Sequence, residues 1–115
     1  MRHHNTKRKF GRERKVRSGL LKSLALSLVV NRKIKTTDSK ARELRPYVEK
    51  MVSQGRLGTL ASRRNLVSKI GVIGANKIVK NISPKYAGRT GGYTRITKLP
   101  RRVSDGSLMA VVEFV

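Results

Sequence analysis

The chain contains no cysteine, no tryptophan and only six acidic residues. The absence of cysteine excludes disulfides, thiolate nucleophiles and zinc sites built on cysteine. Because aromatic residues make up only 4% of the chain, we do not expect a row of exposed rings for stacking single-stranded bases. The scarcity of acids leaves 28 lysines and arginines with a formal net charge of +22 on 115 residues. Such a charge calls for a polyanionic partner, and nucleic acid is the first candidate.

Long hydrophobic runs are also missing. The most apolar stretch, residues 20–30, is shorter than the roughly 20 apolar residues that span a bilayer. Lys22 interrupts it, and Arg32, Lys33 and Lys35 follow where a signal peptide would have its cleavage site, so we expect neither a secretory signal nor a membrane partner. A hydrophobic fraction of 37% suits one modest domain at this length. We predict a basic arm over residues 1–12 and a single domain over residues 13–115.

Few side chains could carry out chemistry. His3 and His4 are the two histidines of the chain, and they are adjacent, whereas helical metal-ligand pairs lie three or four residues apart. The six acids are scattered through the chain and suit helix caps, turns and charge pairs. No P-loop or dinucleotide-binding glycine signature occurs. We therefore predict no enzymatic activity, no metal, no cofactor and no small-molecule substrate.

The N-terminal part of the chain combines an arm with a helix. Residues 1–12 are almost wholly polar and basic, so the arm should be unstructured alone and become ordered on RNA. From about Gly11 to Val30, apolar residues recur at helical spacing, at Val16, Leu20, Leu21, Leu24 and Leu28. Arg8, Lys15 and Lys22, each seven residues apart, lie about half a turn away. The pattern predicts one packed face and one cationic face.

A short strand and three further helices are predicted next. Ile34–Thr37 is rich in β-branched residues, and Thr37 can cap a helix with Asp38 in its first turn. That helix should bury Ala41, Leu44, Val48, Met51 and Val52. Pro46 predicts a kink or break in it, and Gly55 predicts its end. A third helix should begin after Thr59 and bury Leu66, Val67 and Ile70. A fourth should run from about Ala75 to Pro84 and bury Ile78, Val79 and Ile82.

The pattern near the C-terminus changes to that of strands. Residues 93–99 and 108–115 are rich in β-branched and aromatic residues, and a basic turn segment separates them, so we predict an antiparallel pair. Apolar residues occupy both faces of the second strand, which should be central or covered by helices. The predicted class is α+β: a basic N-terminal arm and long helix, a short strand, further helices, and a C-terminal antiparallel strand pair forming a small sheet with the first strand.

Residues 85–95 combine several glycines with two tyrosines and three cations, Lys85, Arg89 and Arg95. Glycines let backbone N–H groups approach phosphates closely, and arginine or tyrosine can stack on splayed bases. The segment therefore indicates an RNA contact. A structural alternative is that it only leads into the strand, with Tyr93 packed on the sheet.

Several short motifs resemble a known family, the bacterial-type large-subunit ribosomal protein seventeen. They are Met1-Arg2-His3, Ile34-Lys35-Thr36-Thr37, Glu43-Leu44-Arg45-Pro46 with Glu49-Lys50, Gly58-Thr59-Leu60 with Arg63-Arg64, Gly91-Gly92-Tyr93-Thr94-Arg95-Ile96, and Met109-Ala110 with Glu113. The resemblance covers essentially the whole chain. It implies a structural protein of the large ribosomal subunit, near the peptide exit, whose partners are large-subunit ribosomal RNA and neighbouring ribosomal proteins.

We expect a cytoplasmic ribosome ahead of an organellar one. The alternative function is a nucleoid-type basic DNA-binding protein, although that class would favour a dimer seam and a pair of ribbon arms. The candidate RNA-binding residues are the cations, histidines, glycines and tyrosine of the segments above: Arg2, His3, His4, Lys7, Arg8, Lys9, Arg12, Lys15, Lys22, Lys35, Arg63, Arg64, Lys85, Arg89, Gly91, Gly92, Tyr93, Arg95, Arg101 and Arg102.

Overall fold

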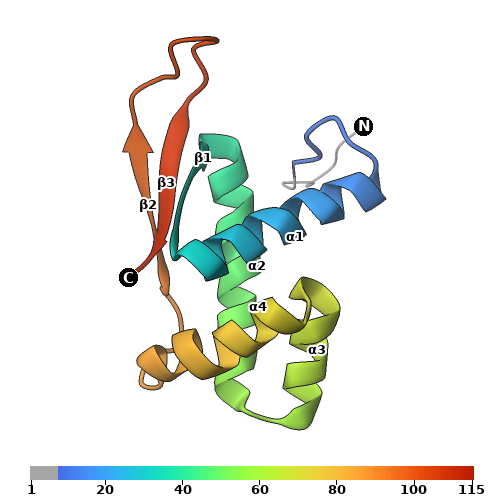
Figure 1. The fold of residues 1–115 in the computed structure, drawn as a ribbon. Helices are drawn as coiled ribbons and strands as arrows, with labels where there is room; N and C mark the ends of the chain where they lie inside the picture. Colours follow the sequence, from blue (N-terminus) through green and yellow to red (C-terminus); the bar gives the residue numbers. More distant parts are fainter. Residues whose placement is uncertain (1–7) are drawn as a thin grey trace, which may run out of the picture.

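The computed structural model of the protein describes residues 8–115, which form helices packed beside a small sheet (Figure 1). The elements are, in order, helix α1 Arg14–Asn31, strand β1 Lys33–Thr37, helices α2 Asp38–Leu57, α3 Leu60–Ile70 and α4 Val72–Lys77, the π-helical turn η1 Ile78–Ile82, the 3-10 turn η2 Ser83–Tyr86, and strands β2 Thr94–Leu99 and β3 Met109–Phe114. The predicted α+β class is confirmed.

The three strands form an antiparallel sheet in the order β1-β3-β2. The last strand was predicted to be central or covered by helices, and it is central, because β3 pairs with β1 on one side and with β2 on the other. Its inward residues Ala110 and Val112 are fully buried. Lys35, Val111 and Thr97 lie in one row across the sheet, on the face that alternates with these buried positions.

Helix α1 departs from its predicted pattern in its first half. Val16, which we expected in the packed stripe, is 54% exposed, whereas Ala25, Leu28 and Val29 are buried. Burial on α1 is therefore confined to its C-terminal half, and helical spacing alone could not show where the supporting surface ends. Arg8 does not continue the cationic face of the helix. It lies before α1, and its guanidinium pairs with the carboxylate of Glu43 on α2 at 2.9 Å.

Helix α2 is longer than predicted and runs without a break. Pro46 lies inside it, and at this exposed position the backbone carbonyl that loses its helical partner can face solvent. Thr37 occupies the predicted cap position, but within residues 8–115 its side chain makes no capping hydrogen bond. The predicted end at Gly55 is wrong. The helix continues to Leu57, and Gly58, with φ of 67°, takes the left-handed conformation that ends helices.

Gly55 instead allows two segments to pack closely. A Cβ atom added there would meet the Ser83 hydroxyl and would lie 2.7 Å from Cγ2 of Ile78. The Ser83 hydroxyl also donates to the backbone oxygen of Val52 at 3.1 Å, so it cannot move away freely. Gly55 is thus the point where α2 contacts the turns after α4.

Replacing Gly55 by alanine should lower the free energy of unfolding by about 2 kcal/mol, because the overpacking cost exceeds the gain in helix propensity. Chemical unfolding followed by circular dichroism measures this. Gly19→Ala is the matched control, since nothing lies near its added Cβ, and it should stabilise by roughly 0.5–1 kcal/mol. Equal effects of the two substitutions would contradict the close packing.

The fourth helix also differs from its prediction. It begins at Val72, three residues before the predicted start at Ala75, and Pro84 does not stop it. The helical path instead changes to a π turn and then to a 3-10 turn, and Pro84 lies in the first turn of the latter, where its missing N–H costs little. Ile78 and Ile82 are buried as predicted, at 0% and 1% exposed.

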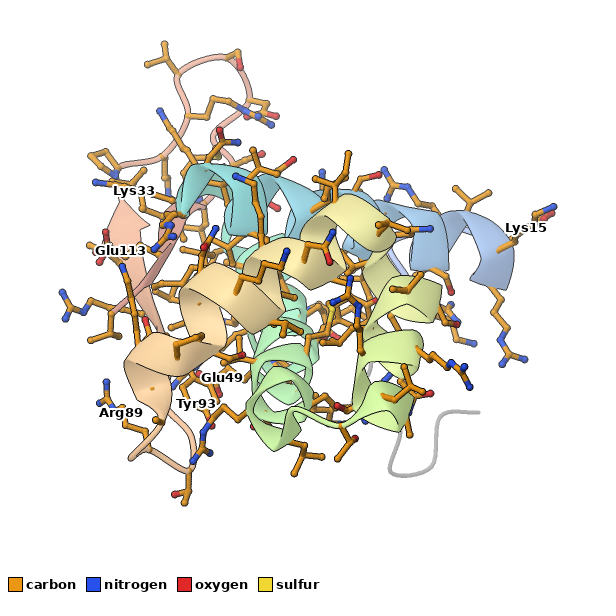
Figure 2. The ribbon with its side chains drawn as sticks, turned by 60° about the horizontal axis from the view of Figure 1, so that its bottom comes forward. Lys15, Lys33, Glu49, Arg89, Tyr93 and Glu113 are labelled. Carbon is orange, nitrogen blue, oxygen red and sulfur yellow. The ribbon has the colours of Figure 1, made fainter. Side chains whose placement is uncertain are left out.

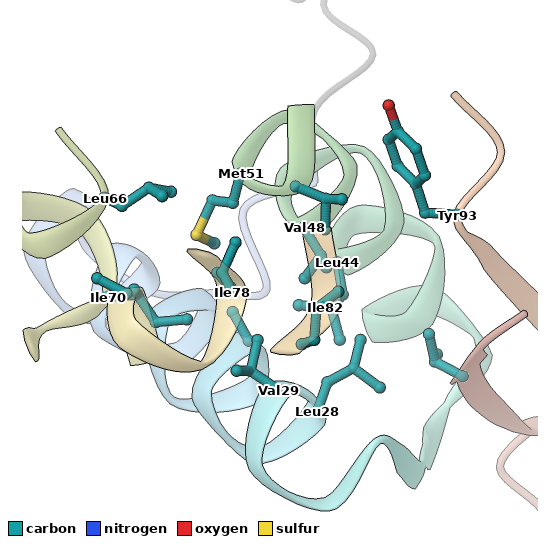
Figure 3. Close-up of a cluster of buried hydrophobic side chains, with 14 of the residues drawn as sticks. Leu28, Val29, Leu44, Val48, Met51, Leu66, Ile70, Ile78, Ile82 and Tyr93 are labelled. Carbon is teal, nitrogen blue, oxygen red and sulfur yellow. The ribbon is translucent and has the colours of Figure 1, made fainter. Parts of the chain in front are cut away.

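The core lies around α2, where side chains from α1, α3, α4 and the turns η1 and η2 come together (Figure 3). Leu44, Val48 and Met51 project from α2, and Leu66 and Ile70 come from α3. Most of these were predicted from helical spacing. Tyr93 closes the core on the side of the sheet, at the start of β2, and it is 0% exposed.

Candidate nucleic-acid interface

The glycine-rich loop, residues 87–92, joins η2 to β2 and is exposed along its whole length. Gly92 has a φ of 68°, a conformation that side chains with a Cβ rarely adopt. Arg89 and Thr90 project from the middle of the loop into solvent. The loop thus presents exposed backbone and a guanidinium together.

Helix α2 holds both ends of this loop. The Arg56 guanidinium donates to the Ala87 carbonyl at 2.9 Å and to the Tyr93 hydroxyl at 3.1 Å. At the far end, a Glu49 carboxylate oxygen accepts from the backbone N–H and the hydroxyl of Thr94, at 3.2 and 3.0 Å. Figure 2 shows Glu49 and Tyr93 close together, with Arg89 further out. Two side chains of one rigid helix therefore set the path of the loop.

Tyr93 is not part of the exposed surface, so its predicted role as an RNA contact is wrong. Its ring is 0% exposed and lies against Tyr86 with ring centroids 5.1 Å apart. Its hydroxyl accepts from Arg56 and lies 3.3 Å from the Arg89 carbonyl. A base cannot stack on a buried ring, so the structural alternative holds for Tyr93, which packs in the core. Buried Tyr93 therefore anchors the C-terminal end of the glycine-rich loop in the core.

A cleft of about 470 Å³ lies beside the loop, between α2 and α3. Its walls include Lys50, Lys69, Thr90 and Gly91. The two lysines come from different helices and were not among the predicted contacts. No pattern in the sequence indicated that these lysines line one cleft, because each resembles an ordinary charged residue on a helix surface. The cleft brings these cations next to the backbone of the glycine-rich loop.

The remaining predicted contacts are spread over several elements. Those that are exposed within residues 8–115 are Lys9, Arg12, Lys15, Lys22, Lys35, Arg63, Arg64, Lys85, Arg95, Arg101 and Arg102. Arg8 is partly exposed and paired with Glu43. Arg2, His3, His4 and Lys7 lie outside the described residues. The structure therefore brings only part of the predicted set together at the glycine-rich loop, and a second group lies at the far end of β2.

Two acidic side chains at the sheet and its long loop are already engaged with cations. Glu113, on the central strand and near one end of the outer sheet face, has carboxylate oxygens 3.9 Å from both Lys33 and Arg95. Asp105 forms two hydrogen bonds with the Arg102 guanidinium, at 2.9 and 2.7 Å. The cations outnumber these acids, so the surface keeps a strong positive potential toward a polyanion.

The two glycines of the loop should respond differently to alanine. Gly92→Ala should lower the free energy of unfolding by about 1 kcal/mol, because alanine is strained at its φ of 68°. Gly91 has no such φ and nothing lies near its added Cβ, so Gly91→Ala should change stability by less than about 0.5 kcal/mol. Thermal unfolding of both variants measures the difference. Equal destabilisation by both would show that the loop has another backbone path.

Two features are absent from residues 8–115. None of the helices there combines the length and apolar character needed to cross a membrane. Within the same residues, no three histidine, cysteine or acidic side chains gather in a way that could hold a metal ion.

Comparison with known proteins agrees with the motifs. The family model of ribosomal protein L17 matches residues 20–115. Large ribosomal subunit protein bL17 of Methylacidiphilum infernorum is 44% identical, covering 99% of this chain and 88% of the relative. The protein of that name from Campylobacter jejuni is 45% identical over 100% of this chain and 99% of the relative, and that from Helicobacter acinonychis is 42% identical over the whole of both.

The ribosomal protein L17 family is structural and non-enzymatic. This agrees with the prediction, made from the scarcity of catalytic side chains, that the protein is not an enzyme. A match over residues 20–115 and relatives aligned along nearly their full length leave one conclusion: the chain belongs to the ribosomal protein L17 family.

Proposed function

We propose that this protein is a structural component of the large ribosomal subunit that binds large-subunit ribosomal RNA near the peptide exit region of cytoplasmic ribosomes, beside neighbouring ribosomal proteins. The main support for the proposal is the exposed glycine-rich loop. Arg56 and Glu49 of α2 hold its two ends, and the lysines of the adjacent cleft border it. Such a surface offers fixed backbone and several cations to one stretch of RNA.

The chemistry of this surface suits phosphates. Backbone N–H groups near the glycines can approach phosphate oxygens closely, and Arg89 adds a planar guanidinium that can bind phosphate in a bidentate manner. Because Arg56 and Glu49 hold the loop before RNA arrives, little conformational entropy is lost there on binding. Most of the affinity then comes from neutralised phosphates, in line with the net charge of +22.

Other parts of the surface extend this contact. We propose that the exposed cations of α1, α3, β1, β2 and the β2–β3 loop also reach RNA, together with Lys85 and the basic arm over residues 1–12. The proposed set is Arg2, His3, His4, Lys7, Arg8, Lys9, Arg12, Lys15, Lys22, Lys35, Arg63, Arg64, Lys85, Arg89, Gly91, Gly92, Arg95, Arg101 and Arg102, to which the cleft adds Lys50 and Lys69.

Sucrose-gradient sedimentation of cell extract tests the proposal. The tagged protein should sediment with large subunits through a high-salt wash. Replacing Gly91 and Gly92 together by valine should reduce incorporation several-fold, because a β-branched residue at the φ of Gly92 moves the loop and all its contacts together. The helix content by circular dichroism should stay nearly unchanged, since no residue of the loop itself belongs to the core.

Two outcomes would contradict this proposal. Sedimentation of the wild-type protein with the nucleoid would favour the DNA-binding alternative. Normal incorporation of the double-valine variant would show that the glycine-rich loop is only a connector. Lys80→Gln in η1, which removes one exposed charge outside the proposed set, is the matched control and should reduce incorporation only slightly.

A further inference from the structure

A second concave surface lies at the other end of β2, under the loop that joins β2 to β3. Figure 1 shows this loop extending well beyond the helices. The cavity beneath it measures about 310 Å³, and its lining includes Lys35, Leu99, Arg101, Arg102, Val103 and Met109. We call it the hairpin cradle. It is separate from the cleft beside the glycine-rich loop, because the two have no lining residue in common.

The cradle has an apolar floor. Leu99 and Met109 are direct partners across β2 and β3, and Met109 is only 8% exposed. Val103 projects from the loop and is fully exposed. An isolated exposed valine is ordinary, but here it stands at the mouth of a cavity whose floor is also apolar. The cavity thus offers three apolar side chains to a ligand.

The rim of the cradle is cationic. Lys35, on β1, is exposed and lies on the same sheet face as Met109, two positions before Thr37, the partner of Met109. Arg101 and Arg102 come from the loop. Among residues 8–115, no acidic side chain lines the cavity. The cradle therefore combines apolar contact surface with two cations, Lys35 and Arg101, and with Arg102, which is paired with Asp105.

The loop is held in shape by its own hydrogen bonds. Asp105 binds the Arg102 guanidinium and accepts from the Ser107 backbone N–H at 3.1 Å. The Arg102 hydrogen bond, followed by that from Ser107, holds the pKa of the Asp105 carboxyl well below its ordinary value, so the carboxylate stays ionised and bound. The Arg101 guanidinium donates to the Gly106 carbonyl at 2.9 Å, which orients it and leaves its other N–H groups for a ligand.

We propose that the hairpin cradle receives a single unstacked nucleotide of RNA. The base packs on Leu99, Met109 and Val103, and its phosphate lies beside Lys35 and Arg101. The cavity is at the small end of the range for ligand sites, which suits one nucleotide and excludes a stacked duplex. Sequence-specific RNA recognition commonly uses such splayed bases. The proposal deepens the proposed function and rests on it for RNA as the source of the nucleotide.

A side chain from a neighbouring protein is the competing occupant. An apolar side chain would fill the floor equally well, but it would leave Lys35 and Arg101 without a counter-charge, since only Arg102 is paired, with Asp105. A nucleotide satisfies both parts of the cradle at once, because it carries an apolar ring face and an anionic phosphate. Charge complementarity therefore favours the nucleotide.

Methyl NMR of the full chain tests the cradle with three small probes: adenosine 5′-monophosphate, ribose 5-phosphate and N-acetyl-leucine amide. The nucleotide should shift the methyl signals of Leu99, Val103 and Met109 saturably, and about tenfold more tightly than ribose 5-phosphate, because only the nucleotide carries a base. Lys35→Gln should weaken nucleotide binding about threefold. Lys33→Gln, on the same strand and outside the cavity lining, is the matched control and should leave binding unchanged.

Three results would overturn the proposal. They are an absence of saturable methyl shifts with the nucleotide, equal affinity for nucleotide and ribose 5-phosphate, or shifts with N-acetyl-leucine amide alone, which would assign the cavity to a protein side chain. Binding of large-subunit ribosomal RNA by the wild-type protein is measured in parallel. RNA binding without nucleotide shifts would refute the cradle and leave the proposed function standing, whereas nucleotide shifts without RNA binding would refute the proposed function alone.

Discussion

Replacing Tyr93 by alanine should lower the free energy of unfolding by about 4 kcal/mol, the largest effect on stability that we expect from one substitution in this protein. The ring is fully buried, so its removal leaves a cavity between α2 and the sheet. The substitution also leaves the Arg56 guanidinium without the hydroxyl to which it donates. Because small domains are stable by only about 5–15 kcal/mol, this variant should lose a large part of its stability.

Tyr93→Phe separates packing from hydrogen bonding. It keeps the ring but removes the oxygen that lies 3.1 Å from Arg56 Nη1 and 3.3 Å from Ser53 Oγ, so it should cost about 1–2 kcal/mol. Urea unfolding in moderate salt, which screens self-repulsion, measures both variants. Affinity of the folded Phe variant for large-subunit ribosomal RNA should stay within about twofold of wild type. A folded Ala variant of full stability but weakened RNA binding would mean that the ring does contact RNA.

Binding of large-subunit ribosomal RNA should weaken steeply as salt rises. Each neutralised phosphate releases condensed counterions, so roughly six phosphate contacts give a log–log slope of about −4 to −5. Between 50 and 200 mM salt, that slope corresponds to a loss of affinity of about 250- to 1000-fold. The expectation follows from the charge of +22 and from the many exposed lysines and arginines on the described surface.

Filter binding or fluorescence anisotropy over a salt series measures this slope. Arg89→Gln should reduce its magnitude by about one, whereas Tyr93→Phe should leave it unchanged, because only Arg89 is exposed. A slope near zero would show that apolar or base-edge contacts dominate. That result would contradict the argument from composition, even if the protein still bound RNA tightly.

Local patterns in the chain were enough to predict most of the fold. Helical spacing of apolar residues placed α1, α2 and α3, and Thr59 was correctly chosen as the N-cap of α3, where its hydroxyl accepts from the Ser62 backbone N–H. Apolar residues on both faces of β3 correctly indicated a central strand. These predictions succeeded because periodicity and capping depend on residues only a few positions apart.

Glycine and proline positions were predicted less well. Glycine and proline are typical of helix ends, yet the helical path continues past both Gly55 and Pro84. Gly55 is needed because Ile78 and Ser83, more than twenty residues later, pack against it. Gly58, which does end α2, was recognised only through its left-handed φ. A breaker residue has several possible structural roles, and distant neighbours decide among them.

The candidate interface was also predicted only in part from the sequence. Composition by itself determined that the protein needs a polyanion, and the cluster of glycines and cations marked the loop over residues 87–92, because charge and backbone freedom are properties of single residues. Only the tertiary structure decided that Tyr93 faces the core, that Arg56 and Glu49 hold the loop, and that Lys35 lies beside Leu99 and Met109. Arg56 and Tyr93 are 37 positions apart, and contacts over such distances arise from the packing of whole elements, which no local pattern encodes.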